Sequence, residues 1–355
     1  MRFRDSCFGE FLREIQNKKL LCIGAGQLFQ DMLVLWDDTI LRKIIFIADN
    51  NKQGHKINVC GSILQVDSVD NILKFCPKDA AILITSMYCK SIYEQLNVLL
   101  KDINIDCYIY PVMSLKTEEF EWVPTNKTPV IPKTIHYFWF GGNKIPEENR
   151  KCIESWKRYC PDYKIIKWTE DNYDITKCNY MIQAYEHRKW GFVSDFARLD
   201  VLFEFGGIYL DTDVELVKSL DDLLYENAFV GFQRNFLTGT GLGCGCKKGE
   251  PLFKEMRDVY YDIHFTENGA LNLLACPYYQ TIFLLKYGLK CNNTFQRIKD
   301  LSVFPTSAFD PQGYASGKIS LIKNTYGIHH YSESWISEKQ QNINSKKYAE
   351  VNYFR

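Results

Sequence analysis

Short apolar runs alternate with longer helical patterns through the first third of the chain. Runs of this kind, separated by segments long enough for a helix, are typical of a parallel α/β unit. We expect strands at residues 19–24, 43–48, 80–85 and 106–110. The pattern therefore predicts a small Rossmann-like α/β domain over residues 1–115.

A proline-rich stretch follows this unit. It holds Pro111, Pro124, Pro129 and Pro132 among Thr, Lys and Glu residues. Such a composition continues neither a helix nor a central strand, because proline lacks the amide hydrogen that both need. We expect a linker over residues 116–131.

A second α/β pattern begins after the linker and defines a domain over residues 132–355. It opens on an apolar strand at 133–140, a Gly141-Gly142 turn and a helix from about Glu147, and another strand follows at 163–168. Neither half contains an internal repeat or a low-complexity tract. At 355 residues the chain also exceeds the usual size of one hydrophobic core, so two domains are expected.

Charge and cysteine usage narrow the class of protein. Lys+Arg and Asp+Glu are both 43, so no overall field favours nucleic acid, and we expect no nucleic-acid partner. The thirteen cysteines form no C-x-x-C pair, which suits free thiols in a reducing cytosol better than disulfides or a thiolate zinc site. No apolar run is long enough to span a bilayer. We expect a cytoplasmic protein and leave open a peripheral contact with the inner face of the membrane.

The first strand of the N-terminal domain runs into Gly24-Ala25-Gly26, and Asp49 closes the next strand. This is half of a dinucleotide-binding fingerprint, but Phe29 stands at the third glycine position, where its bulk spoils the approach of a pyrophosphate. The unit resembles the small Rossmann-like domains of bacterial sugar-modifying proteins. We favour a purely structural role for the glycines, with nucleotide or nucleotide-sugar binding as the alternative.

The candidate chemistry lies in residues 192–213. Apolar residues at helical spacing give a buried helix face, and Asp195 and Arg198 are neighbours on another face. Gly206-Gly207 then ends the helix and allows a tight turn into a short strand at 208–210. Asp211 and Asp213 follow at the end of this strand, where ligands of α/β sheets usually bind.

In an extended segment Asp211 and Asp213 face the same side while Thr212 points away. Two carboxylates suit Mg²⁺ or Mn²⁺, which leave coordination positions open for water and substrate phosphate oxygens. Such a cation would stabilise the charge on a departing diphosphate. An isolated Asp-x-Asp is more often a solvated acidic turn, so its surroundings decide the assignment.

Those surroundings resemble a known family. The Ser-Asp-x-x-Arg helix, the Gly-Gly turn and the Tyr-Leu-Asp-Thr-Asp strand end are similar to the DXD-containing sugar transferases, which include capsular polysaccharide glycosyltransferases, Golgi α-mannosyltransferases and the catalytic domain of large glucosylating toxins. The resemblance extends from about Pro132 to Trp335. It implies an A-type glycosyltransferase fold, with a mixed sheet and a Rossmann-like nucleotide-binding half, behind the N-terminal domain.

The resemblance also assigns a donor site. His136 and Trp139 lie in the opening strand, and Trp139 matches the aromatic that stacks on the nucleotide base, with core packing as the alternative. Asn172 matches a residue that contacts the base or ribose, although asparagine in a turn is often structural. Asp195 and Arg198 would bind hydroxyls of the donor sugar; the alternative is an exposed helical ion pair worth only about 0.3–0.5 kcal/mol.

By the same resemblance Asp195, Arg198 and Asp211 would be the catalytic residues. Tyr209 and Asp211 would also belong to the donor site, where Asp211 would bridge ribose, sugar or a metal-bound water. Asp213 would ligate the cation directly.

The closing segment, residues 325–335, adds His329 and His330, and an imidazole there can complete the shell of Mn²⁺. The two point to opposite sides if extended, so one ligates, with a slight preference for His330. Trp335 would close over the diphosphate, with core packing as its alternative.

Two features depart from the family. Residues 238–245 are unusually rich in glycine, and we expect a flexible loop there, because no Lys-Ser/Thr follows that would make it a phosphate cradle. Cys276-Pro277 stands where Gly-Pro is common. Both departures concern the acceptor side, and the acceptor stays undetermined.

We expect a retaining, metal-dependent hexosyltransferase that uses a nucleotide-sugar donor. UDP-galactose or UDP-glucose is favoured and GDP-mannose is the alternative. The capsular relatives imply a glycan or lipid-linked oligosaccharide acceptor, as in surface polysaccharide synthesis. Two rivals from other classes are a metal-dependent phosphoesterase, which needs a second metal site, and a nucleotide-sugar-binding regulator built on Gly24-x-Gly26.

Overall fold

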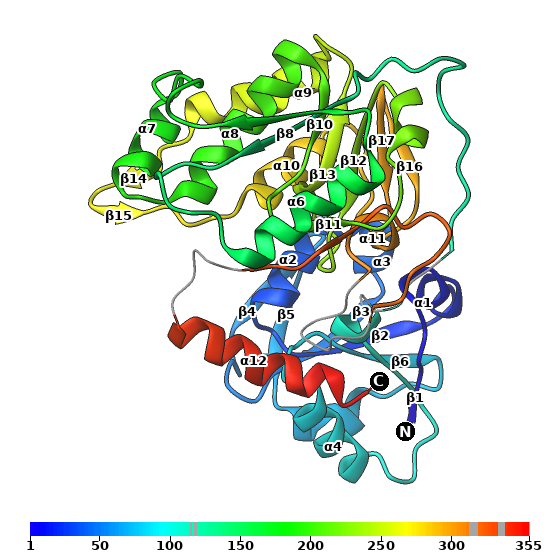
Figure 1. The fold of residues 1–355 in the computed structure, drawn as a ribbon. Coiled ribbons are helices and arrows are strands. Elements are labelled where there is room, and N and C mark those ends of the chain that lie inside the picture. The colour runs from blue at the N-terminus through cyan, green and yellow to red at the C-terminus, as the bar shows by residue number, and fades with distance from the viewer. Residues whose placement is uncertain (114–115, 117–118, 312–318, 333–337, 355) are drawn as a thin grey trace.

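The computed structural model describes the chain except for residues 114–115, 117–118, 312–318, 333–337 and 355 (Figure 1). Two large sheets, each with helices packed on it, use separate parts of the chain. The expected linker, residues 116–131, lies between the last strand of the first sheet and the first strand of the second.

The first sheet takes its strands from residues 2–109. Its elements are β1 (Arg2–Phe3), α1 (Phe8–Glu14), β2 (Lys19–Ile23), α2 (Gln27–Leu35), α3 (Asp38–Leu41), β3 (Ile44–Ala48), β4 (Lys56–Val59), β5 (Ser62–Asp67), the 3₁₀ helix η1 (Val69–Phe75), β6 (Ala80–Ile84), α4 (Cys89–Leu99), β7 (Asp106–Ile109) and α5 (Tyr110–Met113). The strand order is β1-β7-β6-β2-β3-β5-β4. All pairs are parallel except the β4–β5 hairpin. The four predicted strands are confirmed.

The part of the chain after the linker contains the second sheet, whose strands lie within residues 134–304, two separate two-stranded ladders and the helices around them. Its elements are β8 (Thr134–Phe138), α6 (Glu147–Tyr159), β9 (Lys164–Trp168), α7 (Asn179–Glu186), α8 (Trp190–Phe205), β10 (Gly207–Tyr209), β11 (Val214–Leu216), η2 (Asp221–Tyr225), β12 (Ala228–Phe232), β13 (Thr238–Cys246), α9 (Pro251–Asp258), η3 (Val259–Asp262), β14 (Thr266–Glu267), β15 (Ala270–Leu271), α10 (Cys276–Leu285), β16 (Gln296–Ile298), β17 (Leu301–Phe304), α11 (Thr306–Phe309), β18 (Gly327–His329) and α12 (Glu338–Asn352).

This second sheet is mixed. Its order is β16-β17-β12-β13-β10-β8-β9, with β10 parallel to β8 and antiparallel to β13. A separate two-stranded ladder joins β11 to β18 and so brings the segment after the Asp-Thr-Asp sequence against the closing segment. The predicted fold class, a mixed-sheet α/β domain behind a small Rossmann-like α/β domain, is confirmed.

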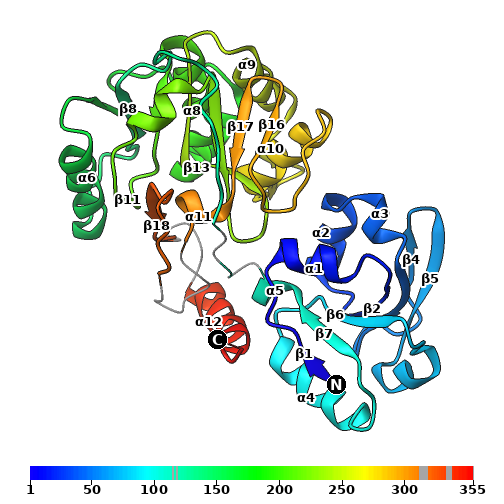
Figure 2. The same ribbon diagram turned by 90° about the vertical axis from the view of Figure 1, so that its right-hand side faces the viewer.

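Helix α8 is the core helix beside this sheet. Its residues 192–202 are all buried, so the helix is not amphipathic with one apolar face but is covered on every side. It packs between α7 and α9 (Figure 1) and against β8 and β13 (Figure 2). Any charged side chain on it is therefore held inside the protein and needs a partner there.

The glycine-rich segment corrects one prediction. Residues 238–245 are not a flexible loop, because they form most of β13, whose nine residues are all buried. Glycine is required there by close packing: a Cβ on Gly245 would lie 2.7 Å from the ring of Phe229 and 2.8 Å from the carbonyl oxygen of Gly207. The glycines let three strands pack tightly where side chains would not fit.

The C-terminal helix returns to the N-terminal unit. α12 lies beside α4 (Figure 1), where the Ser91 hydroxyl donates to the Glu350 carboxylate at 2.9 Å. The ring of Phe354 packs on Phe3 at 5.1 Å. Across the described part of the chain, no helix combines the length and apolar character needed to cross a membrane.

Candidate functional site

Asp195 and Arg198 are buried partners on α8, only 5% and 3% exposed. Arg198 Nη2 lies 3.0 Å from Asp195 Oδ1, and it lies 3.6 Å from an oxygen of Asp211. The alternative of an exposed helical ion pair is therefore wrong. Burial raises the pKa of Asp195 to about 7, although Arg198 opposes this. Burying charges of this kind costs stability unless each charge has a partner and its hydrogen bonds are made.

Two glycines form the turn that connects α8 to β10. Gly206 and Gly207 have φ of +69° and +110°, in the left-handed region that side chains disfavour, so the predicted helix end is confirmed. A Cβ on Gly206 would lie 2.7 Å from the amide nitrogen of Lys248. The turn therefore accepts no side chain, and β10 delivers Asp211 directly beside Arg198.

His136 supports this turn from beneath, which corrects its assignment to the donor site. The side chain is fully buried, and burial lowers its pKa to about 4. The indole N–H of Trp168 lies 3.1 Å from Nδ1 and can only donate, so Nδ1 accepts. Nε2 then carries the proton and donates to the Gly206 carbonyl at 2.9 Å. With both nitrogens occupied, His136 is a structural residue.

Asp211, Thr212 and Asp213 form a turn after β10 and are not extended as predicted. The Val214 amide donates to the carbonyl of Asp211 at 3.0 Å and closes the turn. Both carboxylates still reach the same site, while Thr212 points away and accepts from the side chain of Asn149 at 2.9 Å. The predicted sidedness therefore holds although the backbone differs.

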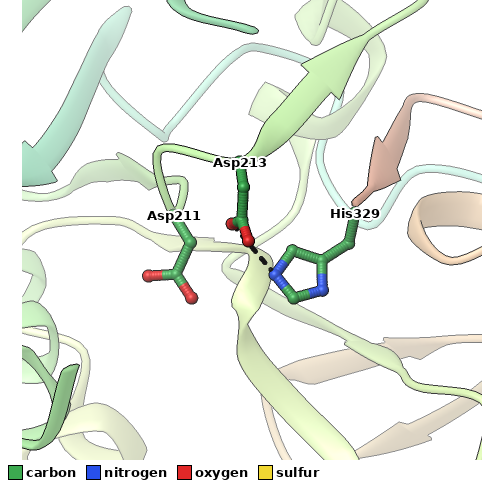
Figure 3. Close-up of side chains that lie close together, drawn as sticks. All are labelled: Asp211, Asp213 and His329. Carbon is green, nitrogen blue, oxygen red and sulfur yellow. Dashed lines mark ion pairs between the residues drawn. The ribbon is translucent and has the colours of Figure 1, made fainter. Parts of the chain in front are cut away.

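His329 joins the two aspartates. Asp211, Asp213 and His329 each offer one ligand atom, and these atoms lie within 4.8 Å of one another (Figure 3). His330 faces the other side of β18, where its Nε2 lies 2.9 Å from Glu215 Oε2. Opposite sides were predicted, but the slight preference for His330 is reversed, because the β11–β18 register places His329 opposite Val214 and thus beside the turn.

Asp213 and His329 shift each other's titration. Burial alone would suppress both charges, yet the mutual attraction across 3.1 Å raises the pKa of His329 and lowers that of Asp213. The backbone and side chain of Ser332 also donate to Asp213, at 2.9 and 3.0 Å. The site thus favours a positive charge between its carboxylates. Two carboxylate oxygens and one imidazole nitrogen are a donor set that fits Mn²⁺ well and Mg²⁺ less well.

Gly241 is a site residue that sequence reasoning missed. It lies on β13 opposite Asp211, whose amide donates to the Gly241 carbonyl at 3.0 Å. A Cβ there would lie 2.1 Å from Asp211 Oδ2 and 3.1 Å from Arg198 Nη1. The glycine-rich composition of residues 238–245 could have indicated this position. Gly241 has no side chain because the Asp211 carboxylate occupies the space that one would fill.

Tyr209 and Asn172 act on their neighbours. The Tyr209 hydroxyl donates to Asp211 Oδ1 at 2.6 Å, and its buried ring lies under the guanidinium of Arg198 at 4.8 Å. It therefore orients Asp211 from within the protein. The side-chain oxygen of Asn172 accepts from the Thr169 amide at 2.7 Å and its nitrogen donates to a carbonyl at 3.0 Å. Because both polar atoms close its own turn, a structural role is favoured for Asn172, and its contact with the donor base stays a prediction.

Of the two tryptophans assigned to the donor, Trp139 lies among the described residues. Trp139 follows β8 and is partly exposed, and its indole N–H donates to the Asn143 carbonyl at 2.6 Å. It stays a candidate for stacking on the base. Trp335 lies outside the described residues.

The N-terminal glycine turn is filled by the protein itself. The carboxylate of Asp49 accepts from the Ala25 amide at 2.8 Å, and Thr85 Oγ1 donates to the Gly24 carbonyl at 2.6 Å. Lys52 Nζ donates to the Ala25 carbonyl at 3.0 Å. The acid that would hold a ribose in a dinucleotide site ties the turn instead, which favours the structural role.

Residues 146–230 match the family described as a glycosyltransferase sugar-binding region containing a DXD motif. This span holds α8, the Gly-Gly turn and both aspartates, so the predicted resemblance to DXD-containing sugar transferases is confirmed.

Two curated relatives each match part of the chain. Inositol phosphoceramide mannosyltransferase 3 of Schizosaccharomyces pombe is 32% identical over 146 residues, 37% of this chain and 38% of that protein. Subversion of eukaryotic traffic protein A of Legionella pneumophila is 26% identical over 165 residues, 36% of this chain and 25% of that protein. The chain thus matches well under half the length of either.

Among solved structures, PaToxG glycosyltransferase is similar with 22% identity and a TM-score of 0.36, covering 44% of this chain and 68% of that one.

Proposed function

From the DXD-containing sugar-binding region in residues 146–230, we propose that this chain is a metal-dependent glycosyltransferase acting on a nucleotide-sugar donor. One observation carries the proposal: Asp211, Asp213 and His329 converge within 4.8 Å directly beside the buried Arg198–Asp195 pair. The Asp211 carboxylate therefore belongs both to the proposed cation site and to the proposed site for the sugar, which Asp195 and Arg198 form. This arrangement suits transfer of a sugar from a diphosphate, because charge develops on both sides of the breaking bond.

Each residue of the site has its own proposed role. Asp211, Asp213 and His329 would hold Mn²⁺ or Mg²⁺, which when bound supplies the charge that stabilises the departing diphosphate. Arg198 donates to hydroxyls of the sugar, and Asp195 can accept from a hydroxyl when ionised or donate when protonated. Tyr209 fixes the rotamer of Asp211. We propose a retaining reaction through an oxocarbenium-like state and assign no covalent nucleophile.

The transferred sugar is proposed to be a hexose. UDP-galactose and UDP-glucose stay candidates for the donor, with the partly exposed Trp139 proposed to stack on the base. The mannosyltransferase among the relatives supports the GDP-mannose alternative. Both nucleotides therefore belong in any test.

The acceptor is proposed to be a glycan or a lipid-linked saccharide. The relative named for inositol phosphoceramide supports a lipid-borne head group as one form of it. We keep the proposal that the protein works in the cytoplasm, and a peripheral contact with the inner face of the membrane stays open. Its thirteen cysteines are all free, which agrees with a reducing compartment.

The two rival functions receive less support. A phosphoesterase of the two-metal type needs a second cluster of ligands, and the described residues contain one such cluster. A regulator that binds a nucleotide at Gly24-x-Gly26 would need an open turn, whereas the Asp49 carboxylate occupies it.

A thermal-shift and hydrolysis screen of UDP- and GDP-hexoses, with and without Mn²⁺, tests the proposal. A donor at 100 times its Kd stabilises the native state by about 2.7 kcal/mol, so the correct nucleotide should stand out. We expect a shift and slow sugar release that both need Mn²⁺. A screen in which no nucleotide sugar gives a Mn²⁺-dependent effect would count against the proposal.

A further inference from the structure

A second polar cluster, made by Arg234, Asp310 and Tyr331, lies directly behind His329. The ring of Tyr331 meets that of His329 edge-on, with centroids 4.0 Å apart. Its hydroxyl donates to Asp310 Oδ2 at 2.6 Å, and Asp310 is 3% exposed. Arg234 holds the same carboxylate through Nη2 at 2.9 Å, Nε at 3.3 Å and its backbone amide at 2.8 Å.

Three separate segments meet in this cluster. Arg234 lies in the turn between β12 and β13, Asp310 follows α11, and Tyr331 follows β18. The Arg234 guanidinium also lies over the Tyr331 ring, 3.9 Å from its centroid. Tyr331 adopts φ of +48°, a left-handed conformation that a tyrosine keeps only where its surroundings impose it. The cluster thus fixes the backbone next to His329 as well as the ring beside it.

His329 depends on such support. Its Nε2 faces Asp213, while Nδ1 is buried and has no hydrogen-bond partner within the described part of the chain. Imidazoles that bind metals usually have their ring plane fixed by a hydrogen bond from the second nitrogen. Here that bond is missing among the described residues, so the ring plane is set by packing, and Tyr331 is the aromatic packed on it.

We propose that Tyr331, Asp310 and Arg234 form a positioning cluster that holds His329 in the orientation a cation needs. The inference rests on the metal-dependent function proposed above. None of the three residues is proposed to touch the cation. Their role is to limit the rotation of the imidazole, so that its nitrogen is presented together with the two carboxylates before the ion arrives.

The turn that carries Arg234 is anchored on the N-terminal domain. Phe236, in the same turn, is fully buried with φ of +61°. Its ring packs on Phe8 of α1 at 5.0 Å and on Tyr110 of α5 at 5.8 Å. The N-terminal domain therefore holds one side of the turn while Arg234, on the other side, holds Asp310. We extend the proposal accordingly: this contact lets the N-terminal domain support the metal site without binding a nucleotide.

Mn²⁺ binding to the full chain, followed by electron paramagnetic resonance of the free ion, tests the cluster without any donor. Tyr331→Phe keeps the ring on His329 and removes the link to Asp310, and Arg234→Ala removes the other end. We expect each to weaken Mn²⁺ binding by about tenfold, the scale seen when residues that orient metal ligands are changed. Phe236→Ala should weaken it several-fold in the same direction.

The control is Arg297→Lys, which perturbs another arginine–carboxylate pair, with buried Glu226 at 3.3 Å, on the edge strand β16. It should lower the melting temperature without changing Mn²⁺ affinity. If Tyr331→Phe and Arg234→Ala remain folded and bind Mn²⁺ as tightly as the wild type while Asp213→Asn does not bind it, the positioning role is overturned and the metal site stands. If the wild type itself binds no Mn²⁺, both proposals fail.

Discussion

Replacing Gly241 by alanine tests whether Asp211 is held where the proposed function needs it. The new Cβ would lie 2.1 Å from Asp211 Oδ2, against about 3.4 Å for ordinary contact, so the two atoms must separate by roughly 1.3 Å. β13 is buried between β10 and β12 and has little room to retreat. The displacement therefore falls on Asp211 and on its 3.6 Å approach to Arg198.

A displacement of that size has a large expected effect. A misplacement of about 1 Å at a reacting group can cost about 100-fold in rate. Overpacking a core costs about 1–3 kcal/mol of stability, which this domain should tolerate while remaining folded. We therefore expect Gly241→Ala to lower kcat/KM for Mn²⁺-dependent release of sugar from the donor by about 100-fold.

Gly239→Ala is the matched control on the same strand, β13. Its Cβ would lie 3.2 Å from Gln233 Oε1 and from Leu242 Cγ, which are side-chain atoms that can give way by a few tenths of an ångström. The assay compares kcat/KM of both variants at equal folded fraction, checked by circular dichroism. Activity of Gly241→Ala equal to that of Gly239→Ala would refute the claim that the position of the Asp211 carboxylate matters.

Three further predictions concern residues around the site. Because burial holds the pKa of His136 near 4, below the 6.5 of the unfolded chain, its contribution is fully present above pH 6.5 and is lost as the pH falls toward 4. In His136→Gln the free energy of unfolding, measured with urea, should change by about 3 kcal/mol less between pH 6.5 and pH 4 than in the wild type. The same change with pH in both proteins would contradict this. Arg198→Lys loses the hydrogen bonds from Nη2 to Asp195 and Ser194 and should lower kcat/KM for the donor by about tenfold or more, while Mn²⁺ affinity measured by calorimetry changes little. A variant with wild-type kinetics would exclude Arg198 from the donor site. Gly206→Ala should lower stability in thermal unfolding by about 2 kcal/mol or more, because a left-handed residue also meets the Lys248 amide at 2.7 Å, whereas Gly249→Ala, also left-handed but open, should cost less; equal losses would argue against the steric cause.

The parts of the fold set by local pattern were predicted well from the sequence. Four of the seven strands of the first sheet, β2, β3, β6 and β7, and the end of α8 at Gly206 follow from apolar runs and from glycine, which are local signals. β13 could not be predicted in the same way, because its glycines are explained by neighbours far away in the chain, such as Phe229 and Asp211. Without those neighbours a glycine-rich segment is typical of a loop.

The site shows the same division. The pairing of Asp195 with Arg198 and the convergence of Asp211 with Asp213 follow from helical and turn geometry over a few residues. The choice of His329 over His330 depends on the register of β18 against β11, which joins segments more than one hundred residues apart. The structural role of His136 depends likewise on Trp168 and on the Gly206 carbonyl.

Asp211, Asp213 and His329 are proposed to hold the cation that activates a nucleotide-sugar donor. The most direct test is donor hydrolysis by the full chain with Mn²⁺ and with a chelator, comparing the wild type with Asp213→Asn and with the exposed control Asp171→Asn. We predict turnover that the chelator abolishes, that Asp171→Asn retains and that Asp213→Asn loses by about 100-fold or more. Unchanged Mn²⁺-dependent turnover in Asp213→Asn would contradict the account.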